Sequence, residues 1–312
     1  MFCHGEWDML GPNRRHRTAG DSSPPVQEAP MTVDTVLTGE AAADLRRREH
    51  RAFEDGAEQY NSNMVDVGRA ARSKLLDLAE LEDGLSMLDV CTGPGWLGID
   101  GARRRSGGRT VGVDLSSAMI AQARTNAEAA GQADVEFAVM DAEALQLADS
   151  SFDRVTCGLG LMHAPNPRAA LAEMGRVACP GARLAVSVWA GAKETIFGPM
   201  AAALRDVAGN RLLLDYDYVT RLGEHGVLES LLADTGWQHT QLHRFEAGAV
   251  IPHADYVWAG FANGTTFGTL VADLPPQDQE RVRQSFTQRC EAFRHDDGLH
   301  IPALQLLATA TR

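Results

Sequence analysis

The sequence predicts an α/β protein with a doubly wound, mostly parallel seven-stranded sheet, and two observations lead to that fold class. Short apolar segments alternate with amphipathic ones through the middle of the chain, which is the pattern of parallel strands joined by helical crossovers. One apolar segment also ends in a glycine-rich turn that leads into a helix, an arrangement typical of the sheet edge where ligands bind in such folds.

The alternation assigns the elements in chain order. Five strands are expected at residues 86–91, 110–114, 135–140, 152–157 and 182–189, with helices between them. Beyond the fifth strand we expect helices at 200–207, 226–235 and 276–293, and strands at 237–244 and 299–309. The segments 191–222 and 252–294 interrupt the alternation, and we expect them to form a cap that lines a substrate pocket.

The chain is expected to form a single domain over residues 45–312, preceded by an extension. Residues 1–44 include polar, proline-containing stretches without periodicity, so we expect disorder there, and Met31 is an alternative start. Within the domain, residues 45–80 are expected to form amphipathic helices and residues 86–190 the ligand-binding core.

Three aspartates lie at the ends of the first three predicted strands, at regular intervals. Asp89 precedes the turn Gly93-x-Gly95-x-x-Gly98, Asp114 comes 25 residues after Asp89, and Asp141 comes 27 residues after Asp114. Each interval is about one strand–helix repeat, so the three carboxylates should meet at the carboxyl edge of the sheet.

The three carboxylates favour one cofactor over another. An acid at Asp114 can accept the hydroxyls of a ribose in NAD or in S-adenosylmethionine. Asp89 would repel a pyrophosphate but attract the ammonium group of a methionine moiety, and Asp141 can accept an adenine amino group. The pattern therefore favours S-adenosylmethionine, with an NAD-dependent dehydrogenase as the alternative.

Seven motifs occur in order along the chain: Leu88–Gly95, Val111–Ile120, Met140–Glu143, Ser151–Val155, Gly158–Pro167, Ala169–Met174 and Pro180–Trp189. With these motifs the sequence resembles the class I S-adenosylmethionine-dependent methyltransferases of the small-molecule type 11, ubiquinone-biosynthesis-like family. The resemblance implies a Rossmann-like sheet closed by an antiparallel C-terminal strand, with N-terminal helices that cover the cofactor. It also implies S-adenosyl-L-homocysteine as the product of the cofactor.

Residues at the matching positions are the predicted cofactor contacts: Asp89, Cys91, Thr92, Gly93, Gly95, Asp114, Leu115, Met119, Asp141, Ala142 and Gly158. Two positions depart from the family pattern. Cys91 replaces the usual first glycine of the loop, which predicts that it keeps ordinary backbone angles. Asn166 replaces a common aspartate, and we expect it to cap the helix that runs to Val177.

Methyl transfer from a sulfonium needs alignment of the acceptor with the methyl group and exclusion of water, and no metal is expected. An acceptor hydroxyl would also need a base. His163 follows the fourth strand and is the candidate, because histidine changes charge near neutral pH; a loop imidazole bonded to backbone is the alternative. Tyr60, in the N-terminal helices, is a candidate pocket residue or a core residue.

The sequence therefore predicts methyl transfer to oxygen, nitrogen or carbon of a small metabolite, such as a secondary metabolite or a quinone-like compound. A non-methylating reaction on the same fold, such as a cyclisation, would leave the same sequence pattern. A non-catalytic binding protein is a further alternative.

Composition limits the partners. The 312 residues carry a formal net charge of −13, which argues against nucleic acid and against anionic membranes. Five cysteines, an odd number without a CxxC pair, favour free thiols in the cytoplasm over a disulfide framework or a zinc site. The oligomeric state is left open, a homodimer included.

Overall fold

The computed structural model describes residues 37–209, 217–262 and 265–312. Most of the predicted extension and the alternative start at Met31 therefore lie outside the described residues. The predicted boundary at residue 45 is wrong, because helix α1 (Gly39–Asp55) begins at Gly39. Its alanines, leucine and arginines favour a helix, and Leu45, Glu49 and Ala52 form a buried face.

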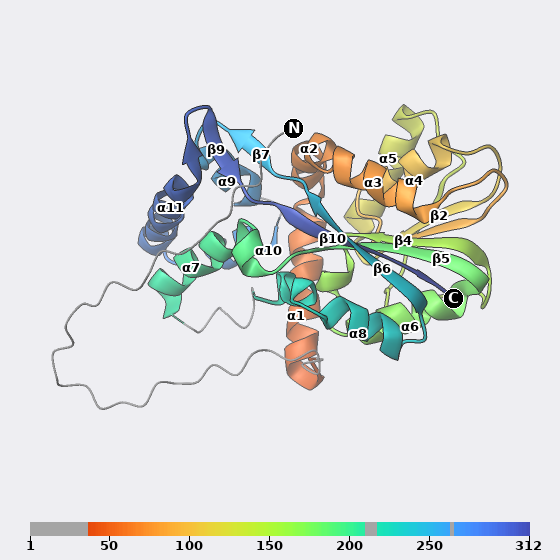
Figure 1. Cartoon of the computed structure of the whole chain (residues 1–312). Coiled ribbons are helices and arrows are strands. Elements are labelled where there is room, and N and C mark those ends of the chain that lie inside the picture. Colours follow the sequence, from red (N-terminus) through yellow and green to blue (C-terminus); the bar gives the residue numbers. More distant parts are fainter. Residues whose placement is uncertain (1–36, 210–216, 263–264) are drawn as a thin grey trace, which may run out of the picture. The chain divides into compact units, whose positions relative to one another are not determined.

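A seven-stranded sheet forms the centre of the fold, in the order β3-β2-β1-β4-β5-β10-β6 (Figure 1). Its strands are β1 (Met87–Val90), β2 (Thr110–Asp114), β3 (Glu136–Val139), β4 (Phe152–Gly158), β5 (Ala178–Trp189), β6 (Gln238–Glu246) and β10 (Leu304–Thr311). The first five pair in parallel, and β10 lies antiparallel to both β5 and β6. This confirms the predicted fold class, with the strand order reversing between β1 and β4.

Helices cover both faces of the sheet. The helices are α1, α2 (Ala57–Val67), α3 (Arg69–Ala79), α4 (Trp96–Arg103), α5 (Ser117–Ala129), α6 (Pro167–Val177), α7 (Phe197–Ala208), α8 (Val227–Asp234), α9 (Ala254–Phe261), α10 (Thr266–Ala272) and α11 (Pro276–Cys290). Helices α3 and α4 lie on one face of the sheet and α6 and α8 on the other (Figure 1). Their apolar side chains pack against the strands. None of the helices in the described part of the chain has the length and apolarity to cross a membrane.

The cap of α6 agrees with its sequence. The Asn166 side chain accepts a hydrogen bond from the backbone N–H of Ala169 at 3.0 Å, and Pro167 occupies the first helical turn. The prediction that Asn166 caps this helix is confirmed, because proline tolerates the first turn and asparagine satisfies a free N–H there.

The predicted strand at residues 299–309 is wrong, because the chain divides there into β9 (Gly298–Ile301) and β10. Pro302, which has no backbone N–H to donate, lies between them and lets the chain pass from one sheet to another. β9 belongs to a small antiparallel sheet with β7 (Ala249–Ile251) and β8 (Arg294–His295). β10 then enters the large sheet from its carboxyl edge.

A second hydrophobic cluster lies apart from the cluster of the sheet. It unites apolar side chains of α7, α9, α10 and α11 with the small sheet, and we call these elements the cap. Leu45 of α1 packs in this cluster, while polar side chains further along α1 bond to the start of α5. Helix α1 therefore connects the cap with the carboxyl edge of the large sheet.

Candidate active site

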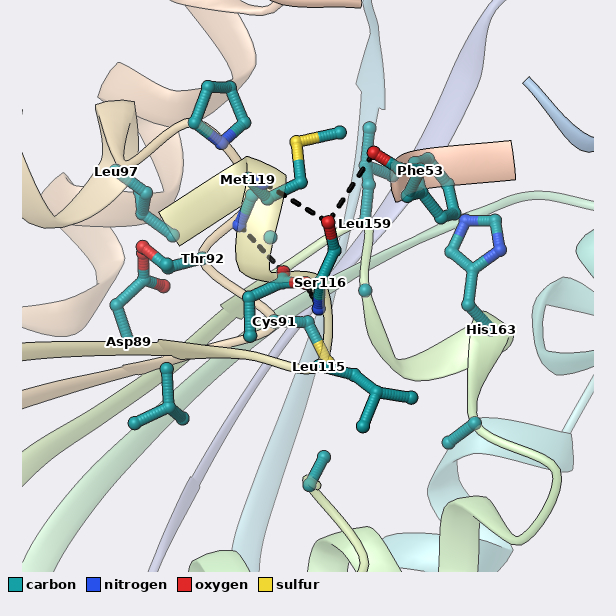
Figure 2. Close-up of a pocket in the computed structure, with 18 of the residues that line it drawn as sticks. Phe53, Asp89, Cys91, Thr92, Leu97, Leu115, Ser116, Met119, Leu159 and His163 are labelled. Carbon is teal, nitrogen blue, oxygen red and sulfur yellow. Dashed lines mark hydrogen bonds between the residues drawn. The ribbon is translucent and has the colours of Figure 1, made fainter. Parts of the chain in front are cut away.

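A cavity lies at the carboxyl edge of the sheet beneath α1, α2 and α3. Its walls come from these helices and from the segments that follow β1, β2, β3 and β4. Figure 2 shows Asp89 and Thr92 at one end of this space and His163 with Phe53 at the other. The predicted candidates that line it are Tyr60, Asp89, Cys91, Thr92, Gly93, Asp114, Leu115, Met119, Asp141, Ala142, Gly158 and His163.

The loop after β1 turns through three residues with left-handed backbone angles. Gly93 and Gly95 have φ of 55° and 85°, and Cys91 has φ of 56°. The prediction that Cys91 keeps ordinary backbone angles is therefore wrong. A non-glycine residue in this region costs roughly 1–2 kcal/mol, and the sharp exit from β1 imposes it.

Gly160, just beyond β4, makes room for the Cys91 side chain. A Cβ atom on Gly160 would lie 2.3 Å from Cys91 Cβ and 3.1 Å from Cys157 Sγ. Cys91 and Cys157 thus meet at the ends of the adjacent strands β1 and β4. The hydrogen bond with the Cys157 thiol, followed by burial, raises the pKa of Cys91, which makes it a packing group rather than a nucleophile.

Gly95 was predicted to contact the cofactor, but it does not line the cavity. It forms the start of α4, with φ of 85°, where a Cβ would lie 2.8 Å from Ala123 Cβ and 3.0 Å from the Phe137 ring. A glycine is therefore needed here for close packing against α5 and β3.

Asp89 is fully buried below the loop. It accepts hydrogen bonds from the hydroxyls of Thr92 at 2.6 Å and Thr156 at 2.9 Å. Burial raises the pKa of Asp89 to about 6, although both hydroxyls oppose the shift. The carboxylate therefore holds the loop in shape and places negative charge at this end of the cavity.

Asp114 joins the glycine loop to the start of α5. Its two oxygens accept hydrogen bonds from the backbone N–H groups of Gly93 at 2.9 Å and Ser116 at 3.0 Å. Burial raises its pKa. A carboxylate has about four acceptor positions, so Asp114 keeps the capacity to accept two ribose hydroxyls from the cavity.

Asp141 follows β3 and lies at the mouth of the cavity. Its Oδ1 accepts from the backbone N–H of Glu143 at 2.9 Å, and Arg46 Nε of α1 lies 3.6 Å from Oδ2. Arg46 also donates to Glu143 at 2.6 Å. The third carboxylate is thus held by a cation from the N-terminal helix.

His163 pairs with a buried carboxylate that sequence reasoning missed. Its Nδ1 lies 2.6 Å from Glu49 Oε2, and Glu49 is only 5% exposed. Glu49 Oε1 accepts from the hydroxyls of Tyr218 and Thr266, the latter at 2.6 Å. An ionised carboxylate only accepts hydrogen bonds, so this contact with Glu49 favours the His163 tautomer with the proton on Nδ1 and the lone pair on Nε2.

Two aromatic rings border the histidine. Phe53 stacks edge-on against His163 with centroids 5.1 Å apart, and Tyr60 lies edge-on to Phe53 at 5.6 Å. Burial and then the Asp114 carboxylate raise the pKa of Tyr60, so its hydroxyl stays protonated. Tyr60 thus lines the cavity on the side of Asp114.

Arg72 of α3 adds a cation to the same wall. Its Nε donates to Asp100 at 3.4 Å, and burial lowers the pKa of its guanidinium, which nevertheless stays charged. Glu49 and Arg72 were missed because charged positions in an amphipathic helix ordinarily face solvent. In the described parts of the chain, no cluster of three or more histidine, cysteine, aspartate or glutamate side chains is arranged to hold a metal ion.

Comparison with known proteins bears on this site. A family model described as a methyltransferase domain matches residues 87–181. The chain is 26% identical over 239 residues to a ubiquinone/menaquinone biosynthesis C-methyltransferase of Roseobacter denitrificans, which covers 72% of this chain and 94% of that protein. It is 29% identical to a demethylmenaquinone methyltransferase of Renibacterium salmoninarum, over 68% of this chain and 94% of that protein.

Solved structures show the same fold. The YcgJ protein of a Bacillus species matches with a TM-score of 0.57 and 18% identity, over 78% of this chain and 98% of that one. A phosphoethanolamine N-methyltransferase of Haemonchus contortus, solved with S-adenosylhomocysteine, matches with a TM-score of 0.57 and 17% identity, over 88% of this chain and 60% of that one.

The fold and its cavity, together with these matches, define a class of enzyme. The chain is a class I S-adenosylmethionine-dependent methyltransferase. Its cofactor is S-adenosylmethionine, as the acids after the first three strands predicted, rather than NAD.

Proposed function

We propose that this enzyme methylates a small aromatic acceptor at a hydroxyl oxygen, or at a ring carbon activated by loss of a hydroxyl proton. The observation that carries the proposal is the His163–Glu49 pair, which faces the same cavity as Asp89, Asp114 and Asp141. Both reactions begin with removal of a hydroxyl proton, and a histidine oriented by a carboxylate is suited to that step.

The residues present fit the cofactor. Asp114 would accept the ribose hydroxyls and Asp141 the adenine amino group, with Leu115 and Met119 against the ring. Asp89 would supply negative charge near the ammonium group, and Arg72 positive charge near the carboxylate of the methionine moiety. When bound, S-adenosylmethionine supplies a methyl group made electrophilic by its positively charged sulfur.

The chain's residues then perform three tasks. His163 Nε2 takes the hydroxyl proton, while Glu49 stabilises the resulting imidazolium through Nδ1. Phe53 and Leu159 supply apolar contact for an aromatic ring, and α1 covers the cavity and excludes water. The deprotonated acceptor oxygen or carbon would then receive the methyl group, and S-adenosylhomocysteine would leave.

The names of the relatives support this acceptor class. Both named relatives act in quinone biosynthesis by their descriptions, and one is described as a C-methyltransferase. We therefore favour quinol-like or phenolic acceptors. We also propose that residues 39–312, counted from the start of α1, act as one domain. We further propose that the protein works in the reducing cytoplasm, because its four described cysteines are free.

The test combines binding with product analysis. Native mass spectrometry with S-adenosylhomocysteine should show one adduct, and a panel of naphthoquinols and phenols should give a product that gains one methyl group. Glu49→Gln should lower turnover about tenfold, whereas Glu40→Gln, an exposed carboxylate on the same helix, should not. Conversion without gain of a methyl group would instead assign a non-methylating reaction to this fold.

A further inference from the structure

Gln305 is a buried polar residue that the proposed chemistry does not use. It lies near the start of β10, paired with Trp189 of β5 and Phe245 of β6, and it is 2% exposed. Gln305 is also one of the residues that line the same cavity as His163. Because β10 runs antiparallel, its first residues lie at the carboxyl edge of the sheet, where ligands bind.

The Gln305 amide has an unmet hydrogen-bonding need. Its Oε1 is buried and has no hydrogen-bond partner. Burying an amide oxygen without a partner costs free energy, so such a group is retained where a ligand supplies the missing donor. Gln241 of β6, which pairs with Thr309 further along β10, is exposed and offers a comparison of the same residue type.

The position of Gln305 points to the acceptor rather than the cofactor. The three carboxylates lie at or just beyond the ends of β1, β2 and β3, whereas β10 is separated from β1 by β4 and β5. Its neighbours in the cavity wall from this half of the sheet are Gly158, Leu159 and Ser187. The Ser187 hydroxyl accepts from the Leu159 N–H at 3.1 Å, which leaves the Gln305 oxygen as an open acceptor.

We propose that Gln305 selects the acceptor substrate by accepting a hydrogen bond from a second donor group, a hydroxyl remote from the atom that reacts. The inference rests on the proposed function, since it assumes an acceptor in this half of the cavity. A site built to bind a hydroxyl discriminates strongly against an analogue without it, because the protein group is then left unpaired. The substrate class is thus a dihydroxy-aromatic compound rather than a monohydroxy one.

The first test needs no ligand. Gln305→Met keeps the side-chain length but removes the unpaired amide, so the variant should melt at a higher temperature than the wild-type protein. Gln241→Met should leave the melting temperature unchanged. A lower melting temperature for Gln305→Met would assign Gln305 to the fold and overturn the proposal.

The second test measures recognition directly. Isothermal titration of the protein saturated with S-adenosylhomocysteine compares 1,4-dihydroxynaphthalene with 4-methoxy-1-naphthol under anaerobic conditions. The wild-type protein and Gln241→Met should prefer the diol about tenfold. Gln305→Met should lose the preference, and Gln305→Glu, which still accepts a hydrogen bond, should keep it.

The outcomes separate the two proposals. Failure of S-adenosylhomocysteine to bind would contradict the proposed function. If it binds but neither naphthol does, or if Gln305→Met prefers the diol as the wild-type protein does, the role of Gln305 is overturned while the cofactor site stands.

Discussion

The two halves of the cavity are built in different ways. In the half that we propose binds the cofactor, called the cofactor half, each carboxylate lies at the end of its own strand and is held by nearby loop groups, as Asp114 is by Ser116 N–H and Asp89 by Thr92. In the other half, called the acceptor half, Glu49 contacts side chains that are distant in the chain. His163 lies 114 positions after Glu49, and Thr266 lies 217 positions after it. The first half is therefore a local feature of strand–loop–helix units, whereas the second exists only after α1 and the cap pack together.

The largest expected effect is a loss of turnover from a substitution in the acceptor half. His163→Ala should lower turnover about 10²- to 10⁴-fold, because it removes the proposed general base. Binding of S-adenosylhomocysteine should stay unchanged, since the carboxylates after β1, β2 and β3 are intact. Steady-state kinetics and calorimetry on one preparation check both values. Equal losses of binding and turnover would contradict the separation of the two halves.

A substitution in the cofactor half should instead lower the affinity for the cofactor. Asp114→Ala should weaken cofactor binding by about 2–3 kcal/mol, because two ribose hydroxyls and the Gly93 N–H lose a charged acceptor. Calorimetry with S-adenosylhomocysteine measures the change, with the exposed Asp134→Asn as the control. Unchanged affinity would move the ribose site elsewhere in the cavity.

A third substitution tests the packing between the loop after β1 and the loop after β4. Gly160→Ala should lower the free energy of unfolding by about 2 kcal/mol, because its Cβ would collide with Cys91 Cβ. In a Cys91→Gly background the same substitution should cost much less, and the double-mutant cycle reports the coupling between the two positions. Additive effects in urea denaturation would show that the two loops do not depend on each other.

The smallest expected effect is a pH dependence from Asp89. The ordinary pKa of an aspartate is 3.8 and that of Asp89 in the fold is about 6, so between these values the folded protein binds a proton that the unfolded chain lacks. Its contribution to stability therefore increases as pH falls, by about 1 kcal/mol between pH 7.5 and 5. Asp89→Asn should lack this contribution, which chemical denaturation of both proteins at the two pH values can measure. An identical pH dependence in both would contradict the raised pKa.

Cofactor affinity should change in the opposite direction. Protonation of Asp89 removes negative charge from the methionine end of the cavity, so binding of S-adenosylhomocysteine should weaken as pH falls below about 6. Burial also raises the pKa of Asp114. We therefore expect its protonation, too, to stabilise the fold and to weaken cofactor binding as pH falls.

The sequence by itself predicted the fold class, the succession of strands along the chain through β5 and the meeting of Asp89, Asp114 and Asp141 at one edge of the sheet. Apolar periodicity, a glycine turn and an acid at each strand end are properties of one strand–loop–helix unit, and they are visible in a short stretch of chain. The cap of α6 at Asn166 was predictable for the same reason. The placement of His163 after β4 also follows from this local pattern.

Only the tertiary structure decided the left-handed backbone conformation of Cys91, the packing role of Gly95 and the division of the last predicted strand at Pro302. It also decided the partners of His163 and the position of Gln305. Glu49 lies in a helix rich in arginine, where a carboxylate ordinarily faces water, and its burial depends on Tyr218 and Thr266 arriving from the far end of the chain. Such contacts are set by packing between distant segments, which no local pattern of residues encodes.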